Sequence, residues 1–264
     1  MAGRSTLRVH RLAQIEQMLA VGEPVTVGQL TDRLGVSEAT VRRDLDSLQQ
    51  SGVVQRTHGG AVPAAGALKE LPFPQRSTVQ VPQKRAIARV AATMVSSGDT
   101  VFIGGGSTAL LLAEQLTERG DADLTVVTNS LPVAGELSRS GRIDVIVLGG
   151  TLRSPELSMI GPRAVEGIRS YRAGLAFLGV PALDGEHGFT ADGDAEAATD
   201  AAFIAMARRT VVLADHTKLG RVSTTHVVPL SSIDTVVTDD GAAAGALADL
   251  RESGTRVVVA EVSP

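Results

Sequence analysis

The chain has 264 residues, 43% of them hydrophobic and 20% charged, and this length suggests one large domain or two unequal ones. It contains no cysteine, which excludes disulfides, thiolate metal sites and cysteine nucleophiles, and its aromatic content of 2% argues against a base-stacking surface for single-stranded nucleic acid. The formal net charge of -4 by itself argues against a nucleic-acid-binding protein.

The sequence carries no pattern typical of export or of membrane insertion. Its first residues lack the apolar core of a signal peptide. The longest nearly apolar stretch, near residues 174–183, is far shorter than the roughly 18 residues that a membrane span needs. We therefore expect a soluble, cytoplasmic protein.

The charge is distributed unevenly along the chain. Residues 1–60 contain seven arginines and six acidic residues, whereas residues 61–264 contain 18 basic and 23 acidic residues. Apolar residues at helical spacing, possible caps and glycines predict the local structure of the first part. In chain order we expect a helix over 7–19 that ends at Gly22, a helix capped by Thr26, a tight turn at Gly35, a helix capped by Ser37 that runs to about Gly52, and a two-stranded hairpin over 53–62.

A helix, a short turn with a glycine and a second helix form the helix-turn-helix pattern, in which the second helix enters the major groove of DNA. On that helix Val41, Leu45 and Leu48 share one face, and polar residues fall on the other. Arginines on the outer face can bind guanine edges or clamp phosphates, and the N–H groups at the helix start can bind a phosphate. The candidate DNA-binding residues are Ser37, Thr40, Arg42, Arg43 and, on the hairpin, Arg56 and His58.

The alternative to DNA binding is an amphipathic helix whose arginines are only solvated, with charge pairs such as Arg43 with Asp46. The preceding helix, the glycine turn, the serine cap and the following hairpin together favour DNA binding.

The first part of the chain also resembles a known family. The run "LTDRLGVSEATVRRDLDSLQQSGVVQRTHGGAV" is similar to the N-terminal signature of the DeoR-type bacterial transcriptional regulators, and the resemblance extends over about residues 7–62. It implies that Thr40, Arg42 and Arg43 contact operator DNA. It also implies structural roles for Asp44 and Leu45.

Beyond residue 60 the pattern changes to a linker followed by alternating strands and helices. We expect a winged helix-turn-helix domain over 1–62, a linker over 63–82 that is rich in Pro and Gly, and an effector-sensing α/β domain over 83–264. Short apolar strands between helices predict a mostly parallel sheet that is covered on both faces. The predicted helices are 84–97, 108–119, 131–140, 162–170, 194–209 and 242–252, and the predicted strands are 100–103, 124–127, 143–148, 174–179, 210–214, 235–237 and 255–260.

A glycine-rich loop joins the strand at 100–103 to the helix at 108–119. Consecutive N–H groups of such a loop can face one point, and hydroxyl groups and the helix N-terminus add further donors for a phosphate. The loop is neither a Walker loop nor a dinucleotide-binding turn, and a tight strand-to-helix turn is the structural alternative.

Small and polar residues also follow the other strands, and in a parallel sheet these strand ends lie at one edge, where ligands bind. The alternatives are a simple turn for Asn129 and a surface position for Lys218. The candidate effector-binding residues are Gly104, Gly105, Gly106, Ser107, Thr108, Asn129, Gly150, Asp215 and Lys218.

Over about residues 73–239 the chain again resembles the DeoR regulators, in the runs "QKRAIARVA", "VVTNS", "VLGG" and "LADHTKLG". The effector domain of that family resembles ribose-5-phosphate isomerase. The resemblance therefore implies an isomerase-like fold that binds a phosphorylated sugar or related metabolite, in a repressor that then leaves its operator. Two positions depart from the family pattern: members often have an acidic residue at Gly104 and a lysine near Asp200. Both departures leave the identity of the effector open.

Two other classes of function stay open. A sugar-phosphate isomerase needs a carboxylate base, which Asp184, Glu186, Asp192 or Asp194 would supply, although a solvated acidic loop accounts for them more simply. A constitutive architectural DNA-binding protein needs no effector pocket.

We expect a regulator of carbohydrate metabolism that is not an enzyme, with operator DNA and a phosphorylated metabolite as partners. The five histidines show no metal-ligand spacing, so no metal or cofactor is expected. A single helix-turn-helix buries too little for specific affinity, which predicts a homo-oligomer, either a dimer or a tetramer.

Overall fold

The computed structural model describes residues 25–51, 53–63, 72–120 and 123–262, together with Arg8 and residues 11–12, 14–15 and 18–19. The chain divides into two compact units, Met1–Leu71 and Pro72–Pro264. The expected first helix is helical at each of its described positions. Its predicted end at Gly22 and the predicted end of the third helix at Gly52 lie outside the described residues.

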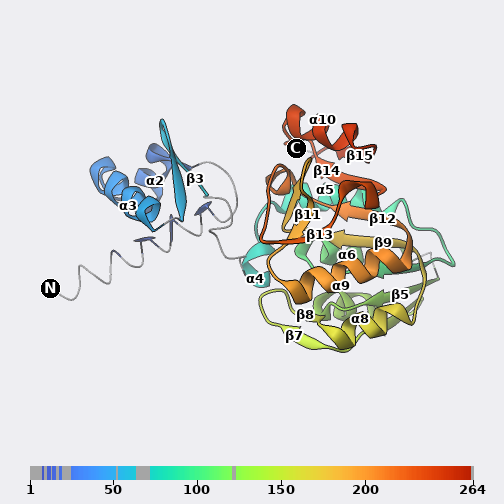
Figure 1. Ribbon diagram of the computed structural model, residues 1–264. Helices are drawn as coiled ribbons and strands as arrows, with labels where there is room; N and C mark the ends of the chain where they lie inside the picture. Colours follow the sequence, from blue (N-terminus) through green and yellow to red (C-terminus); the bar gives the residue numbers. More distant parts are fainter. Residues whose placement is uncertain are drawn as a thin grey trace. The chain divides into compact units, whose positions relative to one another are not determined.

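The first unit contains the predicted helix-turn-helix (Figure 1). Helix α2 spans Val27–Leu34 and α3 spans Glu38–Gln50. Between them Gly35 has a φ of 63°, a left-handed conformation that glycine adopts without strain. The predicted cap at Thr26 is confirmed: its hydroxyl accepts from the backbone N–H of Gln29 at 3.2 Å, and the Gln29 side chain accepts from the Thr26 N–H at 2.8 Å.

The expected hairpin is part of a three-stranded antiparallel sheet of order β1-β3-β2. A Cβ on Gly60 would lie 1.8 Å from the carbonyl oxygen of Val25, so only glycine at this position of β3 lets β1 pair with β3. The sequence pattern does not predict β1, because two residues are too few for a periodicity. The strands are β1 (Val25–Thr26), β2 (Val54–Thr57) and β3 (Gly60–Pro63). The core between this sheet and the helices contains Ile15, Leu19, Leu30, Val41, Leu45, Leu48, Val54 and Ala61.

The second unit is built on a seven-stranded parallel sheet of order β15-β14-β12-β9-β4-β5-β6, which confirms the predicted α/β fold. The chain runs outward from β4 to β5 and β6 on one side, and from β9 to β12, β14 and β15 on the other. The point where this order reverses therefore lies between β4 and β9. The strands are β4 (Thr100–Ile103), β5 (Leu124–Thr128), β6 (Ile143–Val147), β9 (Ala173–Gly179), β12 (Ala207–Leu213), β14 (Thr235–Asp239) and β15 (Arg256–Ala260).

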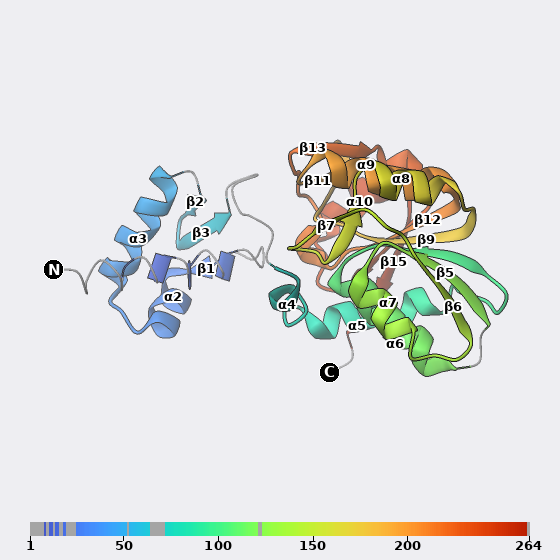
Figure 2. The same ribbon diagram turned by 90° about the horizontal axis from the view of Figure 1, so that it is seen from below.

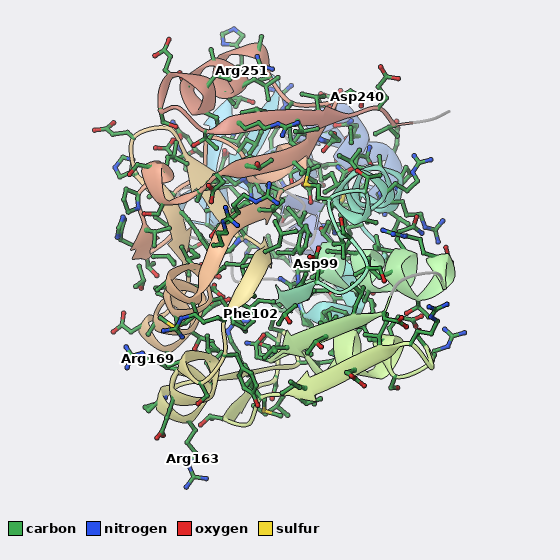
Figure 3. The ribbon with its side chains drawn as sticks, turned by 90° about the vertical axis from the view of Figure 1, so that its right-hand side faces the viewer. Asp99, Phe102, Arg163, Arg169, Asp240 and Arg251 are labelled. Atoms are coloured by element: carbon green, nitrogen blue, oxygen red, sulfur yellow. The ribbon has the colours of Figure 1, made fainter. Side chains whose placement is uncertain are left out.

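Helices cover both faces of this sheet (Figure 2). One face is covered by α5 (Val81–Ala92), α6 (Ser107–Arg119) and α7 (Leu131–Leu137). The other is covered by α8 (Pro162–Arg169), α9 (Asp194–Met206) and α10 (Ala244–Glu252). Phe102 of β4 faces this second side and lies inside the unit in Figure 3, with its ring centroid 5.2 Å from that of Phe203.

Five short strands of the second unit lie outside the predicted set. Strands of three or four residues contain too few alternating positions to be recognised from sequence. β7 (Thr151–Arg153) and β8 (Ser158–Ile160) form a hairpin, and β10 (Ala182–Asp184), β11 (Gly188–Ala191) and β13 (Thr225–Val228) form a small antiparallel sheet. None of the described helices combines the length and the apolar character of a membrane span.

Part of the segment that the composition predicts as a linker is folded into the second unit. Helix α4 (Phe73–Arg76) lies in this segment, and α5 begins at residue 81 and ends at 92 instead of spanning 84–97. Phe73 is buried, and its backbone N–H donates to the carbonyl oxygen of Pro155 at 2.7 Å. Residues 64–71 of the predicted linker lie outside the described residues. The last residues of the expected helix 194–209 belong to β12, which extends to Ala207.

Candidate functional site

Helix α3 presents its predicted recognition residues on its outer face. Arg42 and Arg43 are exposed, whereas Val41 is buried in the core of the unit. Arg42 Nη2 lies 3.3 Å from Glu38 Oε2, and an exposed pair of this kind contributes less than about 1 kcal/mol. Both guanidinium groups are therefore available to DNA at little cost to the fold.

The wing and the start of α3 hold the other predicted DNA-binding residues. Ser37 is the N-cap residue of α3, as predicted, but its hydroxyl forms no hydrogen bond with a backbone N–H and instead lies 3.0 Å from the Thr40 hydroxyl. Because the first N–H groups of a helix have no intrahelical partner, this helix start keeps donors for a phosphate. Arg56 Nη1 lies 3.5 Å from Asp46 Oδ1, so Asp46 pairs with the wing and not with Arg43. His58 is exposed in the hairpin turn.

Asp44 follows the two arginines in sequence but points into the unit. It is 2% exposed and accepts hydrogen bonds from Arg11, whose Nη2 lies 3.2 Å from Oδ1, while Arg8 Nε lies 3.7 Å from the same oxygen. The hydrogen bond to Asp44 raises the pKa of Arg11. The carboxylate thus holds the N-terminal helical segment against α3, which agrees with the structural role implied by the family resemblance.

In the second unit, the glycine loop lies between β4 and α6, beside the point where the strand order reverses. Gly106 has a φ of 127°, which only glycine adopts without strain. A Cβ on Gly104 would lie 2.7 Å from Leu178 Cδ2, so an acidic side chain at this position would displace Leu178. The departure from the family pattern at residue 104 therefore coincides with close packing against β9.

Ser107 and Thr108 open α6 directly after this loop. They are 7% and 6% exposed, and neither hydroxyl forms a hydrogen bond with another described residue. Buried polar groups in folded proteins normally have partners. These two hydroxyls and the open N–H groups of the helix start are therefore donors suited to a bound anion.

Asn129 and Gly150 follow the next two strands. The Asn129 side-chain N–H donates to the carbonyl oxygen of Met159 at 2.8 Å, but its Oδ1 is buried and has no hydrogen-bond partner among the described residues. Gly150 lies close to neighbouring backbone, since a Cβ there would lie 2.9 Å from the carbonyl oxygen of Ile160. Asn129 thus offers a free acceptor to a ligand hydroxyl. Close packing accounts for Gly150, and its contact with an effector stays a prediction.

Asp215 and Lys218 follow β12 in a short 3-10 turn. Asp215 is 3% exposed and accepts from the backbone N–H of Thr217 at 3.1 Å, so it shapes the turn that carries the lysine. Lys218 is partly buried, and its ammonium group forms no hydrogen bond or ion pair with another described residue. Burial lowers its pKa, an effect that the negative charge of Asp215 partly offsets.

Two further cations, the buried Lys84 and the partly buried Arg221, lie near Lys218. Burial lowers the pKa of Lys84 to about 8, although Asp215 opposes this shift. The Lys84 ammonium donates to the carbonyl oxygens of Arg76 and Val79, both at 2.8 Å. Burial also lowers the pKa of Arg221, again opposed by Asp215. Glu156 and Arg76 also act on Lys84 and Lys218, so two carboxylates face four cations and positive charge is in excess.

A second ionic cluster lies against the glycine loop. Arg76 donates to Glu156, and Arg153 Nη2 lies 3.2 Å from Glu196 Oε2. Burial is the main cause that raises the pKa of both glutamates, and the neighbouring arginines oppose it. Asp200, one turn beyond Glu196 on α9, forms no ion pair or hydrogen bond with a described residue. Burial and then the charges of Glu196 and Glu156 raise its pKa well above the ordinary value.

Replacing Asp200 by asparagine is expected to stabilise the protein at neutral pH. The folded state holds the proton of Asp200 more tightly than the unfolded state does, so its ionisation destabilises the fold as the pH rises through the raised pKa. We therefore expect Asp200→Asn to raise the free energy of unfolding clearly at pH 7.5 and by less at pH 5.

Urea unfolding of the second unit between pH 5 and 8 measures this difference. Asp144→Asn, which removes an exposed carboxylate of β6, is the matched control and should change little. A gain in stability that is the same at every pH would show that the charge of Asp200 is not its cause.

Three of the four carboxylates that an isomerase could use as its base accept hydrogen bonds, and the fourth, Glu186, is exposed. Burial alone would raise the pKa of Asp184, but backbone and side-chain hydrogen bonds from His187, with one from Glu186, bring it below the ordinary value. Asp192 accepts from Ser223, and Asp194 Oδ1 lies 3.3 Å from the Thr225 hydroxyl. Within the described residues no group of three or more His, Cys, Asp or Glu has the arrangement of a metal site.

Several members of these clusters carry no sequence pattern that predicts a site residue. They are Arg76, Lys84, Arg153, Glu156, Glu196 and Arg221. Arg76 lies in the segment predicted to be a linker, and the others lie on five different elements or turns, so no local spacing brings them together. The only available signal was the position of Lys84 in the family-like run "QKRAIARVA".

Two family models match the chain, one for each unit. The DeoR-like helix-turn-helix domain matches residues 11–65, and the DeoR C terminal sensor domain matches residues 79–240. Together with the exposed arginines of α3, these matches define a DNA-binding transcriptional regulator and not an enzyme. The chain belongs to the DeoR family, as the resemblance of its motifs predicts.

Individual relatives align over nearly the whole chain. The HTH-type transcriptional regulator GlpR of Haloferax volcanii is 34% identical over 252 residues, which cover 96% of this chain and 98% of that protein. The lactose phosphotransferase system repressor of Lactococcus lactis is 32% identical over 231 residues, which cover 87% and 90%. Ribose 5-phosphate isomerase A from Neisseria gonorrhoeae is a structural neighbour with a TM-score of 0.39 and 20% identity, over 51% of this chain and 52% of that one.

Proposed function

We propose that this protein is a cytoplasmic repressor of a carbohydrate-utilisation operon and that a phosphorylated sugar or a related metabolite releases it from its operator. Membership of the DeoR family supports operator binding through α3. The relative from Lactococcus lactis is a repressor of a lactose phosphotransferase system, which supports a carbohydrate operon.

The observation that carries the effector half of this proposal is the unpaired ammonium group of Lys218. An ammonium group that is partly withdrawn from water and has no partner among the described residues is costly, and this desolvation lowers the pKa of Lys218. A phosphate dianion would supply the missing charge. The glycine loop, with the partnerless hydroxyls of Ser107 and Thr108, offers donors of the kind that bind phosphate.

Release is proposed to occur by a shift of population between two arrangements of subunits. One arrangement places two α3 helices at the spacing of two operator half-sites, and the effector favours the other. A homo-oligomer, either a dimer or a tetramer, is required for this spacing. The unpaired edge strand β6 supports self-association, since Val147 is 50% exposed and Leu152, shortly after it, is 44% exposed.

A thermal-shift screen of the full-length protein against phosphorylated metabolites, followed by operator titration with each stabilising compound, tests the proposal. We expect at least one sugar phosphate to raise the melting temperature and to weaken operator binding. Lys218→Met should weaken the affinity for that compound by about tenfold or more, because a charge-assisted hydrogen bond contributes about 1.5–3 kcal/mol. It should leave operator affinity without effector unchanged.

Arg163→Met is the matched control, since it also removes one cation from the second unit. Arg163 is exposed on α8 and projects away from the molecule in Figure 3. The two variants should therefore differ in effector affinity and agree in operator affinity. If no phosphorylated compound stabilises the wild-type protein, the phosphate half of the proposal fails.

A further inference from the structure

The turn of the β7–β8 hairpin carries Glu156 onto the glycine loop. The turn is well fixed: the backbone N–H of Leu157 donates to the carbonyl oxygen of Arg153 at 2.8 Å, and the carbonyl oxygen of Pro155 accepts from the N–H of Phe73 at 2.7 Å. Glu156 itself is 6% exposed. Its position is thus set by the fold and is not that of a solvated surface side chain.

Glu156 lies against the face of the glycine loop at which Gly105 and Gly106 lack side chains. A Cβ built on Gly105 would lie 3.1 Å from Glu156 Cγ and 3.4 Å from Oε1, and one built on Gly106 would lie 3.7 Å from Oε1. Glycines leave this surface open for a ligand to approach the backbone closely. The carboxylate, an anion with two acceptor oxygens, therefore lies beside the space where a phosphate would meet the loop.

The same carboxylate also holds the nearest guanidinium groups. Arg76 donates to Glu156 Oε2, and Arg153 Nη1 lies 3.8 Å from that oxygen. Arginine binds phosphate as readily as carboxylate, through the same donors. A phosphate at the loop would compete with Glu156 for Arg76 and would repel Glu156 by its charge.

We propose that Glu156 is an internal competitor of the effector: its carboxylate lies at the edge of the anion site and pairs with Arg76, and a phosphate must displace it from the glycine loop and from Arg76. This inference rests on the proposed function, since it takes the loop to be the phosphate site.

The displacement has a structural consequence, because the same turn is hydrogen-bonded to α4 through Phe73 and Pro155. Helix α4 is the first described element of the second unit along the chain after the DNA-binding unit. When a phosphate replaces Glu156 as the partner of Arg76, the turn that carries Glu156 moves. This movement loosens the hydrogen bond between Phe73 and Pro155 that fixes the start of α4.

Inorganic phosphate, the group shared by all candidate effectors, is the probe for the test. A site that is open for only a fraction of the time shows an affinity reduced by that fraction. Glu156→Gln keeps the shape of the side chain and removes its charge, so it should bind phosphate more tightly than wild type, by on the order of tenfold. Glu166→Gln, an exposed carboxylate of α8, is the control and should bind as wild type does. Phosphate is titrated into the full-length protein, and a chloride titration at equal ionic strength is the reference.

A measurement on the wild-type protein keeps the test valid if the variant does not fold. In hydrogen exchange, saturating phosphate should slow exchange at residues 105–109 and speed it at 73–76 and 153–158. Slower exchange at 105–109 without a change at 153–158, or equal phosphate affinity of wild type and Glu156→Gln, would overturn the role of Glu156 but not the phosphate site. Absence of any phosphate effect at 105–109 in either protein would overturn both.

Discussion

Replacing Arg42 and Arg43 together by alanine is expected to weaken operator binding by at least about 100-fold at physiological salt. A well-placed arginine contact with a base edge discriminates by about 1–3 kcal/mol, and each 1.4 kcal/mol is a factor of ten. Both side chains lie on the exposed face of α3, and among the described residues the only ion pair that is lost is the exposed one of Arg42 with Glu38. Stability and effector response should therefore be unchanged, and fluorescence anisotropy with operator DNA measures the loss.

The matched control for this variant removes the same charge elsewhere. Arg85 and Arg89 are exposed on α5, one helical turn apart, and their double replacement by alanine lowers the net charge equally. Because the chain is acidic overall, a loss of binding by both double variants would indicate a general charge effect. If the Arg42/Arg43 variant keeps its affinity for operator DNA at about 150 mM salt, α3 is not the recognition helix.

Single variants separate the two kinds of contact that an arginine makes with DNA. A contact with phosphate changes the salt dependence of binding, so its loss should lower the slope of affinity against salt by about one unit. A contact with a base changes sequence preference and leaves the slope nearly constant. Titrations at several salt concentrations, with operator and unrelated DNA, assign Arg42 and Arg43 to one class or the other.

Replacing Asp44 by alanine is expected to unfold the DNA-binding unit while the second unit stays folded. Removing one partner of a buried ion pair costs about 3–5 kcal/mol, because the other charge is left without compensation. Arg11 would keep its position with an 18% exposed side chain and no carboxylate to accept its hydrogen bonds. A unit of this size rarely has more than about 3–5 kcal/mol of stability in total. Operator binding should be lost as a consequence.

Hydrogen exchange resolved by segment distinguishes this outcome from a global loss of structure. Exchange over residues 25–63 should approach that of an unfolded chain, and exchange over 100–262 should not change. Asp46→Ala, two residues further along the same helix, removes an exposed carboxylate whose pair with Arg56 contributes less than about 1 kcal/mol. Similar effects of the two variants would contradict the structural role of Asp44.

The DNA-binding unit could be predicted almost completely because its signals are local. The capping box at Thr26, the left-handed turn at Gly35 and the apolar face of α3 each depend on residues within a few positions of one another. The contacts between distant segments of this unit could not be predicted from the sequence. The pair of Arg11 with Asp44 joins residues 33 positions apart, and β1 is recognisable only by its pairing with β3.

The fold class of the second unit could also be predicted, but the order of its strands could not. Alternating apolar strands and helices indicate a parallel sheet whatever the order of the strands. The observed order places β4 between β5 and β9, and this brings the loop after β4 next to the end of β9, where Gly179 approaches Gly106. The proximity of this loop to the end of β9 makes this edge of the sheet a candidate site. No periodicity in the sequence predicts that proximity.

By itself the sequence determined that this chain is a helix-turn-helix regulator with an α/β sensor domain, and it pointed to the glycine loop, Asn129 and Lys218. Only the tertiary structure decided which charges meet there. Glu156 and Arg76 are 80 positions apart, and each looks like an ordinary surface residue of a turn or linker in the sequence. The physical reason is that crossover connections of a parallel sheet return to one edge from unrelated parts of the chain. The ionic partners of the site are therefore set by how the strands are ordered, whereas its backbone loop is set by local glycines.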